Sequence, residues 1–150
     1  HFMVEYIQRL SDIQNITRVI RRKVHLRGRE FLSEVLLGTG TLAPSFFEKI
    51  YDTGWESIVT AFKPTEYDKV VAKALSQVEQ SAFLPVLDFW CSSYMIEFLR
   101  KTKQICFGIE PVLAFYLARD HELKIVRAIL NGKRFNYPQD KLKVRVKELY

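Results

Sequence analysis

Apolar residues in the first segment of the chain recur every three or four positions, which is the spacing of one face of an α-helix. The pattern predicts a helix from Phe2 to about Lys23, ended by a basic run and Gly28. A short helix from Arg29 to Leu37 is predicted next, with the Gly38-Thr39-Gly40 turn as its C-terminal cap. The stripe that should face the core consists of Ile7, Leu10, Ile13, Ile16, Val19 and Ile20.

Proline and glycine divide the following stretch into short helices. Pro44 stands where the first turn of a helix tolerates proline, and apolar residues continue from it to Tyr51. Gly54 separates this helix from a second one, which we expect from Trp55 to Phe62. Pro64 marks the next break.

A longer helical pattern runs from Thr65 to about Lys103. Thr65 and Asp68 have the spacing of a capping box, so Thr65 is expected to cap the start of this helix. Pro85 must kink or split it, because proline lacks a backbone donor and crowds the preceding turn.

The clearest helix of the chain is predicted from Pro111 to Leu130, with Asn131-Gly132 as its stop. A last amphipathic helix is predicted from Pro138 to Tyr150. No alternation of strand period is long enough to indicate a sheet, and the chain has only 6 glycines and 5 prolines with which to make sharp turns. The sequence therefore predicts an all-α fold.

Composition sets the broad class. A length of 150 residues suits about one domain, and 48% apolar residues can form a real core, so wholesale disorder is excluded. No apolar run approaches the roughly 20 residues that a bilayer requires, and the charged first 30 residues do not resemble a secretory leader. Cys91 and Cys106 are interpreted as buried or incidental thiols in a reducing compartment, and no cysteine and histidine grouping has the spacing of a metal site.

The two ends of the chain resemble each other. When the sequence is shifted by 110 positions, residues 2–37 fall on residues 112–147. We therefore expect two equivalent repeat units, with Leu117 buried like its counterpart Ile7. Matched pairs are Tyr6/Tyr116, Arg9/Arg119, Asp12/Glu122, Lys23/Lys133 and Leu32/Leu142, and apolar character is kept at Ile7/Leu117, Ile13/Leu123, Ile16/Val126, Val19/Ile129, Ile20/Leu130 and Leu36/Val146.

These segments carry a resemblance to a known family, the central-stalk connector of V-type and A-type ATPases, which is the C subunit of the prokaryotic enzymes and the d subunit of the eukaryotic enzyme. The likeness is strongest from Cys106 to Lys133, and Ile125 departs from it, since the family tends to have asparagine there. The resembling residues are Phe107 to Ala114, Tyr116 to Ala118, Glu122, Arg127 to Leu130 and Gly132-Lys133, together with Asp12 to Ile16 and Gly38 to Leu42 from an earlier repeat.

The resemblance implies a helical bundle built from pseudo-repeats, as part of a larger funnel-shaped subunit. Residues 1–37 would be the end of one helical repeat continuing into the next, and residues 38–150 the final helical repeat. It also implies a non-catalytic role without cofactor, metal or small-molecule substrate. The partners would be rotor-shaft subunits and membrane-ring subunits, and the protein would be cytoplasmic, peripheral to the membrane only through the complex.

Basic residues are the first candidates for a binding function, since the chain has a net charge of +6. A solvated helix end, a phosphate-binding patch, and a surface for an acidic protein partner or anionic lipid are all open interpretations. A basic helical nucleic-acid-binding module is therefore the alternative function, although no DNA or RNA motif accompanies the basic run. The candidate partner-binding residues are Arg18, Arg21, Arg22, Lys23, Arg27, Lys143 and Lys147.

An enzyme is the third class of function, and the sequence offers it no coherent set of residues. Arg119 and Glu122, and Asp120 and Lys124, have the spacing of helix ion pairs, and Arg9 and Asp12 repeat the first of them. His121 lies beside these residues without an evident nucleophile. The glycine turn at residues 38–41 lacks the following lysine of a nucleotide-binding loop.

Overall fold

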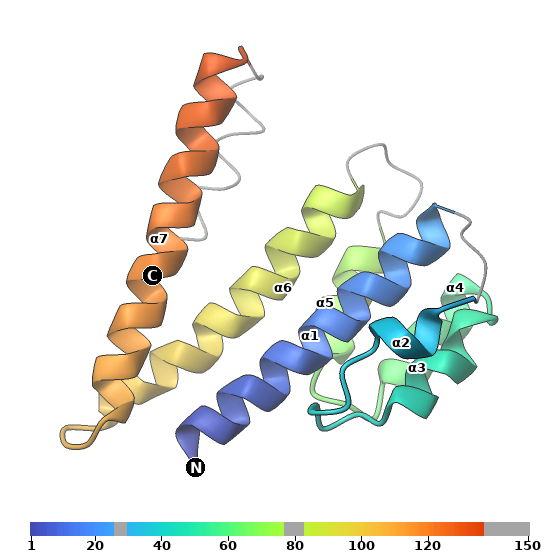
Figure 1. The fold of residues 1–150 in the computed structure, drawn as a ribbon, viewed down its shortest axis with the longest axis horizontal. Helices are drawn as coiled ribbons and strands as arrows, with labels where there is room; N and C mark the ends of the chain where they lie inside the picture. The colour runs from blue at the N-terminus through green and yellow to red at the C-terminus, as the bar shows by residue number, and fades with distance from the viewer. Residues whose placement is uncertain (26–29, 77–82, 137–150) are drawn as a thin grey trace. The chain divides into compact units, whose positions relative to one another are not determined.

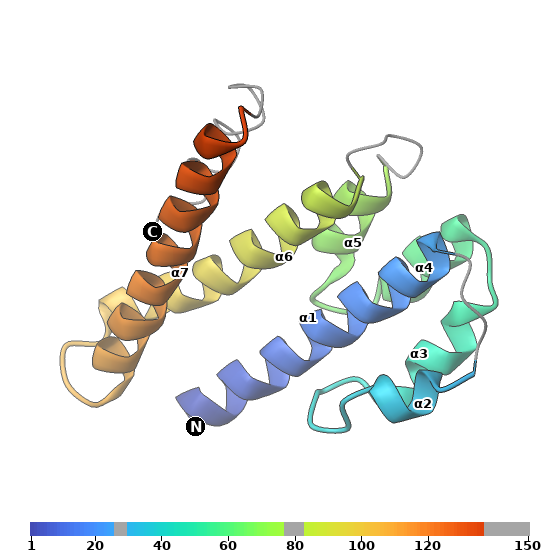
Figure 2. The ribbon, with the colours of Figure 1, turned by 45° about the horizontal axis from the view of Figure 1, so that its top comes forward.

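The computed structural model describes residues 1–25, 30–76 and 83–136, and the regular elements in these ranges are helices (Figures 1 and 2). No strand occurs in these ranges, so the predicted all-α class is confirmed. The elements are α1 (Phe2–Val24), α2 (Leu32–Val35), α3 (Pro44–Tyr51), α4 (Trp55–Phe62), α5 (Asp68–Leu75), α6 (Phe83–Arg100), the 3₁₀-helix η1 (Lys101–Gln104) and α7 (Glu110–Arg134).

The chain divides into two compact units, His1–Cys91 and Ser92–Tyr150, and the boundary lies within α6. This division reflects which residues pack together in space. The repeat boundary at residue 37 is predicted from similarity between two parts of the sequence, so the division does not test it. The assignment of residues 1–37 and 38–150 to successive repeats therefore stays a prediction.

The first unit is organised around α1. Helix α3 packs against α1 and also contacts α2 and α4, while α4 packs against α5. In both views α2 and α3 lie along one side of α1, and the start of α6 lies along another (Figures 1 and 2). Burial of this much apolar surface is the main favourable term for folding. The most buried core side chains include Ile16, Val19 and Ile20 of α1, Phe47, Ile58, Phe62, Val71 and Ala74 of α3 to α5, and Leu87 of α6.

The second unit contains the end of α6, η1 and α7. Helix η1 contacts α7, and the Thr102 hydroxyl donates a 2.7 Å hydrogen bond to the Leu99 carbonyl oxygen. Gly108, in the turn before α7, has a φ of 119°, a region that side chains rarely adopt. The buried side of α7 consists of small or aliphatic residues, namely Ala114, Ala118 and Ile125.

Four predicted helices are confirmed within about two residues, namely α1, α3, α4 and the start of α7. The short second helix is only four residues long, from Leu32 to Val35. The long pattern after Thr65 is divided, because α5 ends at Leu75, and Pro85 lies in the first described turn of α6.

Two predicted helix ends are wrong. Helix α5 begins at Asp68, and the Thr65 hydroxyl donates to the Phe62 carbonyl oxygen rather than capping a helix. Helix α7 continues through Asn131-Gly132 to Arg134, and the Phe135 N–H still bonds to the Asn131 carbonyl oxygen at 3.0 Å. A single glycine weakens a helix by about 1 kcal/mol but does not end it when the ladder continues. The predicted helix at residues 138–150 lies outside the described residues.

The expectation that Ile7 belongs to the core is also wrong, since it is 47% exposed. Burial along α1 begins only at Ser11, so the apolar stripe extends one turn beyond the helices that cover it. Its counterpart Leu117 is half-buried rather than buried. Equivalence of the two repeat units is therefore not established by these two positions.

Candidate functional site

A buried carboxylate organises the most polar region of the first unit. Asp12 of α1 is fully buried, and its Oδ2 accepts hydrogen bonds from the Thr41 N–H at 2.9 Å and the Tyr67 hydroxyl at 2.8 Å. The Thr41 hydroxyl donates to the same oxygen, and the Leu42 N–H donates to Oδ1 at 3.1 Å. We call Asp12, Gly40, Thr41, Leu42 and Tyr67 the Asp12 cluster. A buried charge of this kind is tolerated only when donors surround it.

The glycine turn is shaped by this carboxylate. A Cβ at Gly40 would lie 1.9 Å from Asp12 Oδ1, so only glycine permits this approach. The predicted role of the turn as a helix cap is wrong, because α2 ends at Val35 and its capping residue Leu36 is extended. The turn instead wraps its N–H groups around the side chain of Asp12.

Neighbouring polar residues of α1 bind the chain just before this turn. The Asn15 side chain donates to the Leu37 carbonyl oxygen at 2.8 Å and accepts from the Leu37 N–H at 2.8 Å. The hydroxyl oxygens of Ser11 and Thr39 lie 2.7 Å apart. Three side chains on one face of α1 therefore fix the backbone of residues 37–42.

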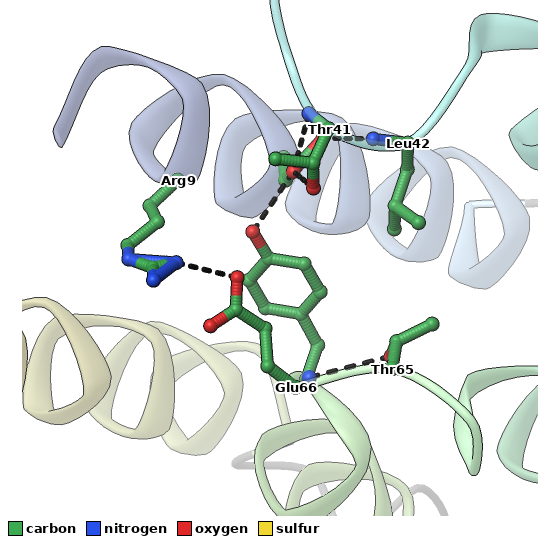
Figure 3. A network of polar contacts seen from close by, with 7 residues as sticks. Arg9, Thr41, Leu42, Thr65 and Glu66 are labelled. Carbon is green, nitrogen blue, oxygen red and sulfur yellow. Dashed lines mark hydrogen bonds and ion pairs between the residues drawn. The ribbon is translucent and has the colours of Figure 1, made fainter. Parts of the chain in front are cut away.

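Arg9 connects α1 to the segment before α5. Its guanidinium forms an ion pair with Glu66 at 2.5 Å, next to Tyr67 in the sequence (Figure 3). Asp12 accepts hydrogen bonds from the glycine turn and from Tyr67, and its predicted pairing with Arg9 stays a prediction. The contact with Glu66 joins residues 57 positions apart, which local spacing cannot reveal.

The basic end of α1, comprising Arg18, Arg21, Arg22 and Lys23, binds other parts of the same chain. Arg18 donates to the Val35 carbonyl oxygen at 2.7 Å. Arg21 forms an ion pair with Asp88 of α6 at 2.6 Å. Arg22 donates to the Glu30 carbonyl oxygen.

Lys23 has the most elaborate environment of the four. Its Nζ donates to the carbonyl oxygens of Tyr51 at 2.7 Å and Thr53 at 2.6 Å, at the C-terminal end of α3. The same ammonium lies 5.4 Å from the centre of the Trp55 ring. A cation at a helix C-terminus compensates the negative end of the helix dipole and satisfies unpaired carbonyl groups.

The structure therefore brings four of the predicted partner-binding residues together and gives each a contact within the chain. Arg27, Lys143 and Lys147 lie outside the described residues. A role for these residues in binding a partner stays a prediction.

The charged turn of α7 forms the predicted helix ion pairs. Arg119 and Glu122 lie 2.6 Å apart, and Lys124 and Asp120 lie 2.6 Å apart. The hydrogen bond from Lys124 lowers the pKa of Asp120 below its ordinary value. His121 is half-buried beside them. These contacts are structural, and no nucleophile lies among them.

The two cysteines have different surroundings. Cys91 is buried, with its Sγ 3.7 Å from the Thr17 hydroxyl, while Cys106 is exposed. Burial raises the pKa of the Cys91 thiol to about 11, against a partial opposing effect of Thr17. Both are free thiols, as the sequence predicted.

Two kinds of feature are absent from the part of the chain that the structure describes. Residues 1–25, 30–76 and 83–136 contain no group of three or more His, Cys, Asp or Glu side chains placed to hold a metal ion. Within the same ranges, each helix is too short or too polar to cross a bilayer.

Comparison with known proteins decides the family. The model of the ATP synthase (C/AC39) subunit family matches residues 1–145, nearly the whole chain. The chain belongs to the C/AC39 family. The segments that hold the Asp12 cluster and the α7 ion pairs are both within the matched range.

Relatives of the C/AC39 family share low identity over almost the full chain. The C subunit of the V-type sodium ATPase of Enterococcus hirae is 24% identical over 148 residues, covering 99% of this chain and 44% of the relative. The C subunit of the A-type ATP synthase of Methanocaldococcus jannaschii is 22% identical over 142 residues, covering 93% and 36%. That of Pyrococcus abyssi is 23% identical over 149 residues, covering 97% and 40%. The chain thus spans about two fifths of these relatives, and no solved structure gives a significant match.

The sequence indicates both parts of the Asp12 cluster but not their contact. The stretches Asp12 to Ile16 and Gly38 to Leu42 each carry the family resemblance. The contact between these two stretches could have been predicted from three polar residues, Ser11, Asp12 and Asn15, which lie on an otherwise apolar helix face. Such residues need partners, and a glycine turn offers free N–H groups.

Proposed function

We propose that this chain is part of a non-catalytic connector subunit of a V-type or A-type rotary ATPase, which joins the rotor shaft to the membrane ring. The observation that carries the proposal is the family match over residues 1–145. In this role the subunit transmits torque between ATP turnover and ion movement and makes or breaks no bond itself. It needs no cofactor and takes no small-molecule substrate.

The contacts of α1 suit a part that bears torque. Asp12 and Asn15 fix the register between α1 and residues 37–42, and Arg9 and Lys23 bind the region of α3 to α5. Directional hydrogen bonds to a buried carboxylate are lost if one element slides along another, whereas apolar packing tolerates small shifts. This polar network supports a rigid connector.

The partners would be rotor-shaft subunits and membrane-ring subunits, and the protein would be peripheral to the cytoplasmic side of the membrane. Arg21 is the most exposed of the four basic residues at the end of α1. Its side chain is 46% exposed, and its partner Asp88 is 43% exposed, so the pair can exchange with carboxylates of another subunit.

The proposal is tested by mixing the full-length protein with purified shaft and ring subunits and following complex formation by size-exclusion chromatography. We expect one complex that contains all three components. The swapped variant Arg21→Glu/Asp88→Arg keeps an ion pair and the net charge of the chain but reverses the sign of the charge at both positions, and it should weaken assembly at low salt. Lys69→Glu, on an exposed position of α5, is the control.

The effect of the swap should shrink with salt, since the Debye length falls to about 3 Å at 1 M. A protein that ignores the ATPase subunits but binds nucleic acid, with log affinity falling linearly with log salt, would instead be the alternative nucleic-acid-binding module. That result would remove the proposed function.

A further inference from the structure

The dipeptide Asn131-Gly132 lies inside helix α7, although asparagine followed by glycine is typical of a turn. Helix α7 ends only at Arg134, and the Phe135 N–H still donates to the Asn131 carbonyl oxygen at 3.0 Å. Asn131 is exposed, whereas Gly132 is buried. The structure thus places this dipeptide in a helical backbone, one turn from the helix end.

An asparagine followed by a glycine is a reactive pair in an unfolded chain. The backbone nitrogen of the glycine attacks the side-chain amide carbon of the asparagine. A C–N bond forms, and the amide nitrogen leaves as ammonia with the proton of the backbone N–H. Water then opens the resulting succinimide ring at either carbonyl carbon and leaves aspartate or isoaspartate. Glycine favours the attack because it has no side chain to obstruct the ring.

A helical backbone prevents this ring closure. The five-membered succinimide ring fixes the ψ angle of the asparagine far from the helical value of about −42°. The helical ladder also holds each N–H in a hydrogen bond to the carbonyl oxygen four residues earlier. The Gly132 nitrogen can therefore attack Asn131 only when the last turn of α7 opens.

The last turn of α7 has features that allow it to open. Asn131, Lys133, Arg134 and Phe135 are all exposed, so few apolar contacts among the described residues resist opening. Gly132 itself weakens a helix by about 1 kcal/mol relative to alanine. The helix therefore delays the reaction but does not abolish it.

We propose that Asn131 is a modification site, at which the Gly132 nitrogen converts the asparagine into aspartate or isoaspartate at a rate set by the opening of the last turn of α7. Both reacting groups belong to adjacent residues of one helix. The conversion therefore needs only water and requires no enzyme, metal or partner.

The product loosens the helix end that delayed its formation. Isoaspartate adds a methylene group to the backbone, which breaks the ladder that joins Asn131 to Phe135. Either product also places a negative charge in residues 123–134, a stretch with four cations and no carboxylate. The conversion is therefore a one-way change at the end of α7, which accumulates as the protein ages.

The test compares the full-length protein kept folded in buffer with the same protein unfolded in guanidinium chloride, at one pH and temperature. Mass spectrometry of the tryptic peptide that begins at Ala128 measures the fraction of Asn131 in which a carboxylate has replaced the amide. We expect conversion in the folded protein to be slower by about tenfold or more, equivalent to at least about 1.4 kcal/mol for opening the last turn.

Asn15 is the internal control. Its side chain donates to the Leu37 carbonyl oxygen and accepts from the Leu37 N–H, both at 2.8 Å, and the branched side chain of Ile16 obstructs attack by the following nitrogen. Asn15 should therefore keep its amide in both samples while Asn131 converts.

Two matched variants test the role of helix opening. Lys133→Gly and Lys133→Ala remove the same charge from the last turn, but glycine lowers helix stability by about 1 kcal/mol relative to alanine. Folded Lys133→Gly should therefore convert Asn131 about fivefold faster than folded Lys133→Ala. The two variants should convert at the same rate in guanidinium chloride.

The effect on the helix is measured by hydrogen exchange. Ion-exchange chromatography separates the converted protein, which has one more negative charge. Its backbone amides in residues 128–136 should exchange faster than those of the unconverted protein. Equal exchange would exclude the proposed loosening of α7.

Four results would overturn the modification site itself. These are no conversion of Asn131 in guanidinium chloride, equal rates in the folded and unfolded protein, equal rates in folded Lys133→Gly and Lys133→Ala, and no conversion of folded Lys133→Gly over several weeks. None of these results bears on the proposed function, because the conversion involves no other subunit.

Discussion

The Tyr67 hydroxyl donates a 2.8 Å hydrogen bond to the buried carboxylate of Asp12, 55 residues earlier in the chain. The bond joins α1 to the residue that precedes α5, and Tyr67 is itself among the largest fully buried side chains. It is one of the contacts that set how α1 lies against the helices covering it.

Removal of this hydroxyl should destabilise the protein. Tyr67→Phe takes away one donor to a buried charge, and we expect the free energy of unfolding to fall by about 1.5–3 kcal/mol. Urea denaturation followed by circular dichroism measures the change. Tyr116→Phe is the control, because the Tyr116 side chain is exposed and its change should stay below about 0.5 kcal/mol. Equal effects of the two substitutions would show that the Asp12 cluster adds no stability.

A methyl group at Gly40 should be costly, and one at Gly38 should not. A Cβ at Gly40 would overlap Asp12 Oδ1, while one at Gly38 would meet no atom within 4 Å. We expect Gly40→Ala to cost about 1–3 kcal/mol through the displaced carboxylate and its lost bonds. Gly38→Ala should be neutral or stabilise by up to about 1 kcal/mol by restricting the unfolded chain. Thermal unfolding of the two variants measures the difference. A lower melting temperature for Gly38→Ala than for Gly40→Ala would contradict the described turn.

The Lys23 ammonium should stabilise the end of α3. Lys23→Met keeps the aliphatic stem but removes the donors to the Tyr51 and Thr53 carbonyl oxygens, and we expect a loss of about 1–3 kcal/mol. The matched Lys69→Met removes an exposed ammonium of α5 and should change little. If the two variants unfold at the same denaturant concentration, Lys23 is only a solvated cation.

Particular residues show what could be predicted from the sequence. The three-and-four spacing of apolar residues predicts α1, α3, α4 and most of α7, because that spacing reflects burial of one helix face. The partners of Asp12 and Arg9 could not be predicted, since they lie 29–57 residues away, beyond the reach of local spacing. The turn at Gly40 follows a short helix in the sequence and therefore resembles a helix cap. Its contact with Asp12 of α1 forms only when the chain folds, so the sequence does not reveal it.

The two thiols should react at very different rates. Cys106 is exposed, and Cys91 is buried with a pKa of about 11, so a thiol reagent at pH 8 should modify one thiol quickly and the second only on unfolding. The pKa of Cys91 is higher in the folded protein than the ordinary thiol value of 9.0. Its contribution to stability is therefore present below about pH 9 and decreases as the pH rises toward 11. Cys91→Ala should remove the slow phase, and two fast thiols in the native protein would contradict the burial of Cys91.

The central claim is that the full-length protein couples shaft rotation to the membrane ring without taking part in chemistry. The most direct measurement is ion transport into vesicles per ATP hydrolysed, by the ATPase reconstituted with and without this protein. We predict that the complex lacking it hydrolyses ATP without transporting ions, and that addition of the purified protein restores transport. An unchanged ratio of transport to hydrolysis in the absence of this protein would contradict the account. So would a catalytic part that hydrolyses no ATP unless this protein is added.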